Sequence, residues 1–103
     1  MKITYKNLIG KVMMVGITYC DSDGNIKERK QCWGTVTEAD KGKILIEQKN
    51  GELLSLPPDL SAIEPAPEGE YKLHSTGEVV VNPDFLSTWI SEQNDDITAK
   101  NQL

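Results

Sequence analysis

The sequence is poor in the side chains that most often carry chemistry. Its 103 residues include one histidine, His74, and two cysteines, Cys20 and Cys32, and aromatic residues make up only 6%. The spacing of the cysteines matches neither a zinc pattern nor a redox Cys-x-x-Cys motif. With a single histidine, a zinc site would depend on carboxylate ligands, which is uncommon. We therefore expect no metal ion, and two reduced thiols rather than a disulfide.

Long apolar runs are also missing. The chain has no stretch of about 18 apolar residues, the length that crosses a bilayer as a helix. Residues 1–6 do not open a secretory signal, and the apolar stretch Val12–Ile17 is too short for the core of one. These features, together with thiols that fit a reducing compartment, predict a cytoplasmic protein with no membrane partner.

No catalytic constellation stands out. His74 beside Ser75 suggests a nucleophile and its base, but neighbouring strand residues point to opposite faces and nothing marks an orienting acid. The glycines are isolated, so the chain has no phosphate-binding loop. Carboxylates such as Glu68 and Glu70 lie in a proline-rich segment, where solvated charge is a simpler explanation than acid–base chemistry. We predict a protein that is not an enzyme and needs no cofactor.

Charge, by contrast, is abundant and divided along the chain. Residues 1–50 carry nine Lys/Arg and six Asp/Glu, a balance of +3. Residues 51–103 carry two lysines and ten acids, a balance of −8. An acidic half attracts a basic partner and repels nucleic acid. This distribution predicts that the protein works by binding.

The local sequence patterns are those of β-strands. Strand-forming residues fill six segments: 12–19, 26–38, 44–48, 52–56, 70–76 and 78–82. Gly34 interrupts the second segment and predicts a bulge or bend. The pair Asn50-Gly51 predicts a type I′ hairpin between the third and fourth segments. Residues 82–91 favour a turn followed by a last strand, with a short helix as the alternative.

Four of the five prolines lie between Pro57 and Gly69. This density predicts a long, semi-rigid loop, in which residues 59–63 could form one turn of helix. At most one short helix is expected in the whole fold. We expect an all-β fold, a small and strongly bent antiparallel barrel that forms a single domain over residues 1–91. Residues 92–103 are polar and are expected to form a flexible tail.

The first half resembles an Sm-like, or SH3-like, small barrel. The resemblance lies in residues 8–12 (LIGKV) and 34–40 (GTVTEAD), which have the apolar-Gly-Lys opening and the glycine-bearing strand that ends in aspartate. RNA binding in the Sm family uses that aspartate with an asparagine four positions on and a later Arg-Gly pair. Here those positions hold Ile44 and Asn50. The resemblance therefore implies the fold and not the nucleic-acid binding.

The second half resembles short bacterial immunity proteins of contact-dependent or other polymorphic toxin systems. The similar segments are LPPDL (56–60), GEY (69–71), STGEVV (75–80) and NPDF (82–85). This resemblance implies a protein with no activity of its own that binds a co-inherited toxin and occludes its active site.

We expect the binding surface at the acids of the proline-rich loop and its borders. A nuclease toxin has a cationic substrate cleft, where carboxylates can occupy the place of phosphates. Proline lowers the entropy that such a loop loses on docking. The residues expected to contact a basic toxin domain are Asp59, Glu64, Glu68, Glu70 and Asp84.

The alternative is an Sm-like nucleic-acid-binding or regulatory module. An exposed tryptophan among cations can stack on a nucleobase, and Trp33 follows Lys27, Arg29 and Lys30 in the sequence. The competing interpretation of Trp33 is a packed side chain in the core or at the mouth of the barrel.

Overall fold

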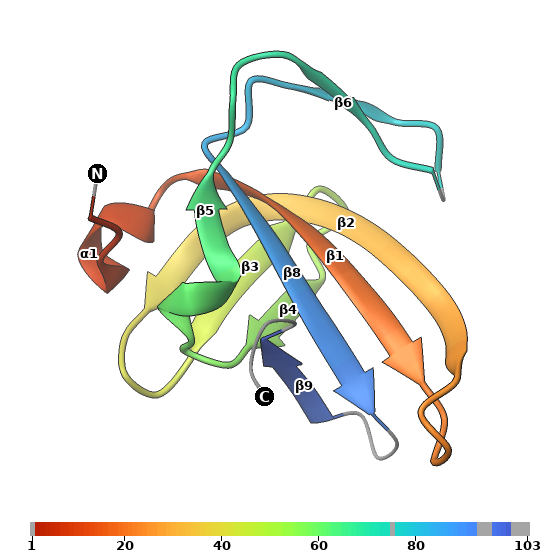
Figure 1. Ribbon diagram of the computed structural model, residues 1–103. Helices are drawn as coiled ribbons and strands as arrows, with labels where there is room; N and C mark the ends of the chain where they lie inside the picture. Colours follow the sequence, from red (N-terminus) through yellow and green to blue (C-terminus); the bar gives the residue numbers. More distant parts are fainter. Residues whose placement is uncertain (1, 75, 93–95, 100–103) are drawn as a thin grey trace.

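A bent sheet of seven strands makes up most of the molecule (Figure 1). The computed structural model describes residues 2–74, 76–92 and 96–99. The strands of the large sheet are β1 (Val12–Cys20), β2 (Ile26–Ala39), β3 (Ile44–Gln48), β4 (Leu53–Leu56), β5 (Ile63–Pro65), β8 (Phe85–Glu92) and β9 (Asp96–Ala99). A separate hairpin consists of β6 (Glu70–Lys72) and β7 (Val79–Val81), and the short helical segments are α1 (Tyr5–Leu8) and the 3-10 turn η1 (Leu60–Ala62).

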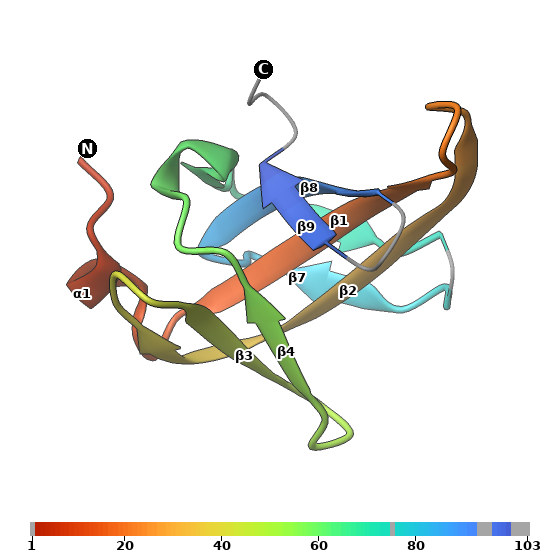
Figure 2. The same cartoon turned by 90° about the horizontal axis from the view of Figure 1, so that it is seen from below.

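The strand order is β4-β3-β2-β1-β8, and both β5 and β9 pair with the remaining edge of β8. Neighbouring strands are antiparallel except β1 and β8, which run parallel. Because β4 pairs only with β3 among the described strands, the sheet curls but stays open (Figure 2). The all-β prediction is confirmed, whereas the barrel, expected to be closed and antiparallel, is an open sheet with one parallel seam.

Alternate residues of β1 serve two different hydrophobic clusters. Met13, Val15 and Ile17 point to the inner face of the curl, where they join the main core with residues such as Trp89. Met14 points to the outer face. Apolar residues on both faces therefore explain why β1 reads as a nearly continuous hydrophobic run, as expected of a strand covered on both sides.

The hairpin between β3 and β4 forms at Asn50-Gly51 as predicted, but with a different turn. Its loop has three residues, since the Gln48 N–H donates to the Glu52 carbonyl oxygen at 2.9 Å. Gly51 has a φ of +88°, while Asn50 does not have a positive φ. A three-residue loop that ends in a left-handed glycine replaces the type I′ turn, which needs positive φ at both central residues.

Gly34 marks a close approach between strands rather than the bulge itself. The register of β2 against β3 shifts between Val36 and Glu38, beyond the glycine. A Cβ atom at Gly34 would overlap the carbonyl oxygen of Glu47 and the side chain of Ile46. The glycine is therefore required for β3 to lie against β2.

The proline-rich segment contains more regular structure than predicted. The helical turn η1 lies within the expected residues 59–63, but the strand β5 follows directly and pairs with β8. Residues 82–91 adopt the favoured turn and strand, and β9 lies within the expected tail, paired with β8. The other tail residues, 93–95 and 100–103, lie outside the described residues.

Gly34→Ala is expected to lower the free energy of unfolding by about 1 to 3 kcal/mol, because the added methyl group forces β3 away from β2. Urea unfolding followed by circular dichroism measures the change. Gly16→Ala is the matched control, since a Cβ atom there meets only the Ser87 carbonyl oxygen, at 3.9 Å. Its stability is expected to lie within about 1 kcal/mol of the wild type. Equal stability of the two variants would contradict the close-approach explanation.

Candidate functional site

The β6–β7 hairpin covers part of the outer face of the sheet (Figure 1). Leu73 and Val80 are buried in its contact with Met14 of β1, and Trp33 of β2 packs against the same cluster. A two-stranded hairpin has little stability by itself, so this packing holds it in place. The position of the hairpin leaves a hollow on one of its sides.

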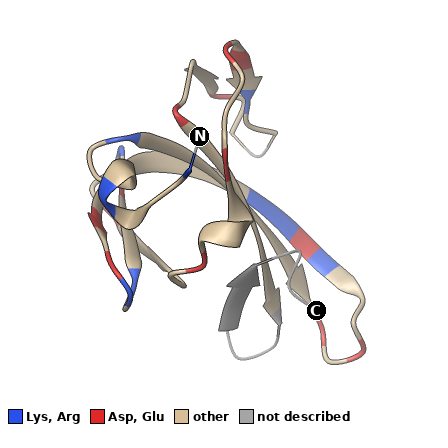
Figure 3. Cartoon of the chain, turned by 60° about the vertical axis from the view of Figure 1, so that its left-hand side comes forward, with Lys and Arg blue, Asp and Glu red and all other residues tan. Residues whose placement is uncertain are grey.

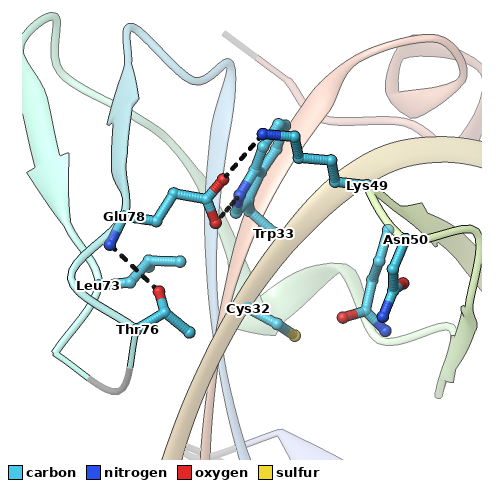
Figure 4. Close-up of a pocket in the computed structure, with 8 residues that line it drawn as sticks. Cys32, Trp33, Lys49, Asn50, Leu73, Thr76 and Glu78 are labelled. Atoms are coloured by element: carbon cyan, nitrogen blue, oxygen red, sulfur yellow. Dashed lines mark hydrogen bonds and ion pairs between the residues drawn. The ribbon is translucent and has the colours of Figure 1, made fainter.

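This hollow is a cavity of about 440 Å³ between the β6–β7 hairpin and the β3–β4 turn (Figure 4). β2 forms its floor, because β3 pairs with β2 only from Gly34 onward and leaves the preceding residues uncovered on that side. The volume is within the range of small-molecule and side-chain binding pockets. We call it the Glu78 pocket; its lining residues are Cys32, Trp33, Gln48, Lys49, Asn50, Leu73, Thr76 and Glu78.

Glu78 links the two sides of this pocket (Figure 4). The Trp33 indole N–H donates to Glu78 Oε1 at 2.8 Å, and Lys49 Nζ lies 3.9 Å from Oε2. The Glu78 side chain is 33% exposed and that of Lys49 is 79% exposed. The indole bond is therefore short and partly shielded, whereas the ion pair is long and open to solvent, which makes it weak.

Cys32 is the one thiol that lines the pocket. Burial raises its pKa above the ordinary value of 9.0, and the nearby positive charge of Lys30 opposes this effect only in part. A thiol with a raised pKa is protonated at neutral pH and is a poor nucleophile. Cys32 and Cys20 are both free cysteines.

Two of the five predicted partner-binding acids have structural roles. Asp59 caps η1, because its carboxylate accepts the Ser61 N–H at 3.0 Å. Asp84 exchanges two hydrogen bonds with Val12: its N–H donates to the Val12 carbonyl oxygen, and its Oδ2 accepts the Val12 N–H, both at 2.9 Å. These two carboxylates are engaged where the chain turns, at the start of η1 and at the entry to β8.

The other three predicted acids, Glu64, Glu68 and Glu70, are exposed. They lie on residues 64–70, which run from β5 through the connection to the first residue of β6 and which we call the acidic strap. Their side chains form no hydrogen bond or ion pair within the described part of the chain. Figure 3 shows acids along this connection and cations at the far end of β2.

Hydrogen bonds fix the acidic strap to the turn before β8. The Ala66 N–H donates to the Asp84 carbonyl oxygen at 3.1 Å. Gly69 and Asn82 exchange two bonds of 2.8 Å, one through the Asn82 side chain. The Tyr71 hydroxyl donates to the Pro67 carbonyl oxygen at 2.6 Å. The prediction of a semi-rigid loop is consistent with these ties.

Among the residues of the nucleic-acid alternative, Trp33 and Arg29 share the outer face of β2, whereas Lys30 lies on the inner face. Trp33 faces the hairpin cluster, and its indole N–H is bonded to an acid. Lys30 lies opposite Ile17 on the inner face, whereas Arg29 lies opposite Thr18 on the outer face. The indole is therefore packed, as the competing interpretation of Trp33 proposed.

His74 lies at the tip of the hairpin, where its backbone N–H donates to Gln31 Oε1 at 2.6 Å. Its side chain is exposed and borders a second cavity, of about 460 Å³, with Arg29 and Thr88. Ser75, the nucleophile considered with it, lies outside the described residues.

Among the described residues, no group of three or more His, Cys, Asp or Glu side chains is placed to hold a metal ion. Within the same residues, no helix has the length and apolar character needed to span a bilayer. No protein-family model matches the chain, and neither the curated proteins nor the solved structures contain a match.

No sequence pattern predicted the Glu78 pocket. Trp33 and Glu78 are 45 positions apart, and neither lies in a motif that pairs them. The available signal was the alternation along β2, which places Trp33 opposite Met14 on the outer face. That pattern shows which way the indole points but not what covers it.

Cys32 is expected to react slowly with iodoacetamide at neutral pH, because burial raises the pKa of its thiol. In a Cys20→Ser variant, the alkylation rate should still be rising at the pH where a free cysteine in a peptide is already mostly ionised, because the pKa of Cys32 is raised. Mass spectrometry of samples quenched across a pH series measures the rate. If the alkylation rate of Cys32 reached half its maximum at a lower pH than that of the peptide cysteine, the assignment of a raised pKa would be contradicted.

Glu78→Ala is expected to destabilise the fold by about 1 to 3 kcal/mol, because the partly buried indole N–H of Trp33 loses its acceptor. Glu78→Gln is the matched variant, since its amide oxygen can still accept this bond. Its stability should lie within about 1 kcal/mol of the wild type. Urea unfolding measures both, and equal losses would show that the charge of Glu78, not the indole bond, stabilises the hairpin.

Proposed function

We propose that this protein is an immunity-type inhibitor that binds a basic toxin domain, of nuclease type, through the acidic strap and performs no catalysis itself. The observation that carries the proposal is a set of three exposed, unengaged carboxylates on a segment that is tied to the rest of the fold. The resemblance of the second half to short bacterial immunity proteins, and of the first half to Sm-like small barrels, belongs to this proposal.

The fixed geometry of the strap supports a binding role. Ordering a flexible segment on docking costs free energy, and each immobilised side chain adds to that cost. The bonds from Ala66 and Gly69 to the turn before β8, together with Pro65 and Pro67, remove much of this cost before a partner arrives. A strap of this kind presents its charges in a nearly constant arrangement.

The charge of the strap supports a basic partner. Glu64, Glu68 and Glu70 are three of the sixteen acids that give the chain its net charge of −5. Long-range attraction to a cationic cleft raises association rates, to about 10⁸ M⁻¹s⁻¹ at low salt in favourable cases. A nuclease cleft that binds phosphates is a surface with the required charge.

Reversing the strap charges is expected to slow association with a basic toxin domain by about tenfold or more at low salt. The variant is Glu64→Lys, Glu68→Lys and Glu70→Lys combined, and the partner is the basic C-terminal toxin domain that the immunity function predicts for a neighbouring gene. Stopped-flow kinetics measure association, and growth of bacteria that express the toxin domain measures protection.

The matched control reverses three acids outside the strap: Glu28, Glu47 and Glu52. It changes the net charge by the same amount, so a slower rate confined to the strap variant assigns the effect to position rather than total charge. Unchanged association of the strap variant would overturn the role of the strap. Failure of the wild-type protein to protect the cells would overturn the immunity function.

A further inference from the structure

The Glu78 pocket combines an apolar wall with a single carboxylate. Cys32, Trp33 and Leu73 supply carbon and sulfur surface, while Asn50 supplies an amide group on the opposite side, as Figure 4 shows. Gln48 also lines the pocket. Glu78 is the only acid among the lining residues, all of which the structure describes. The other charged lining residue is Lys49, which is exposed and pairs with Glu78, so a cation with an apolar stem can fit the pocket in its place.

Glu78 is oriented before any ligand binds. Its Oε1 accepts the indole N–H of Trp33 at 2.8 Å, which fixes the carboxylate plane at the rim of the pocket. Its Oε2 remains available and is directed toward Lys49. A carboxylate held in this way loses little freedom when it accepts a further hydrogen bond.

Lys49 shows what kind of group this carboxylate attracts. Its ammonium lies 3.9 Å from Glu78 Oε2, on a side chain that is 79% exposed. Exposed ion pairs of this length contribute little stability, so another cation can replace Lys49 at little cost. Lys49 therefore occupies the position that a ligand cation would take.

We propose that the Glu78 pocket binds the guanidinium group of an arginine side chain from a partner protein, in place of Lys49. The assignment of the arginine to a partner rests on the proposed function, because a basic toxin domain supplies such side chains. The binding of a guanidinium group rests on the pocket alone.

Arginine suits the lining better than lysine. Its planar guanidinium carries five N–H donors, enough to bond to Oε2 of Glu78 once Lys49 is displaced and also to the amide oxygen of Gln48. Guanidinium planes also pack on tryptophan rings, and Trp33 lines the pocket. Arginine side chains buried in pockets are among the residues that contribute most to protein–protein affinity.

Binding is tested with the peptide acetyl-Gly-Arg-Gly-amide, without any toxin. Nuclear magnetic resonance follows the indole N–H signal of Trp33, whose shift depends on its bond to Glu78, and the signal is assigned with Trp33→Phe. The indole of Trp89 is fully buried and serves as an internal reference. The same peptide with citrulline, a neutral isostere of arginine, is expected to bind about tenfold more weakly.

Two variants separate binding from a purely structural role. Glu78→Gln keeps an acceptor for the indole but removes the charge, and should weaken the arginine peptide about tenfold. Lys49→Met removes the competing cation and should strengthen binding about twofold to fivefold. Lys41→Met is the control for Lys49→Met, since it removes one exposed positive charge away from the pocket and should leave the affinity unchanged.

Equal binding of the arginine and citrulline peptides overturns the proposal, as does unchanged affinity in Glu78→Gln or weaker binding in Lys49→Met. Equal binding of a lysine peptide overturns the preference for arginine. Because these measurements contain no toxin, they are independent of the protection assay: a pocket that binds arginine in a protein that fails to protect cells leaves only the immunity function disproved.

Discussion

The parallel pairing of β1 with β8 is the constraint on which the rest of the structure depends. It joins the two halves of the chain from Met13 opposite Phe85 to Tyr19 opposite Ser91. The paired bonds between Asp84 and Val12 set the register at the start of this seam. A slip of one residue would exchange the inner and outer faces of β8, because the side chains of a strand alternate with a period of two. The main core and the cluster beneath the hairpin would both be lost.

Local features of the fold could be predicted because they depend on neighbouring residues. Strand-forming runs located β1 to β4 closely, and Asn50-Gly51 located a turn. The parallel seam could not be predicted in this way, since Val12 and Asp84 are 72 positions apart and no local pattern distinguishes a parallel from an antiparallel neighbour. The expectation of an antiparallel barrel failed at this contact. Gly34 was predicted to mark a bulge or bend, whereas it provides space for β3, a strand that lies elsewhere in the sequence.

For the candidate site, too, the sequence predicts some features and not others. Sequence gives the position of each acid but not whether its oxygens already have a partner, and Asp59 and Asp84 proved to be engaged within the fold. The three acids of the strap remain available for a partner. The Glu78 pocket arises only when the hairpin is laid over β2, so its carboxylate looked in the sequence like one more surface charge. Both candidate surfaces involve the segment between β5 and β8, while the large sheet supports them.

That segment is a long insertion, here called the excursion, in the connection between the paired strands β5 and β8. Pro65 and Phe85 lie opposite each other at the ends of β5 and β8, so residues 66–84 leave the sheet and return to the place where they began. Lengthening or replacing the excursion would leave the seam and the main core intact, provided that Asp84 were kept and that Met14 and Leu86 were still covered. A fold of this design can change its binding partner through substitutions in one continuous stretch of chain. Selection can then act on binding without lowering the stability of the sheet.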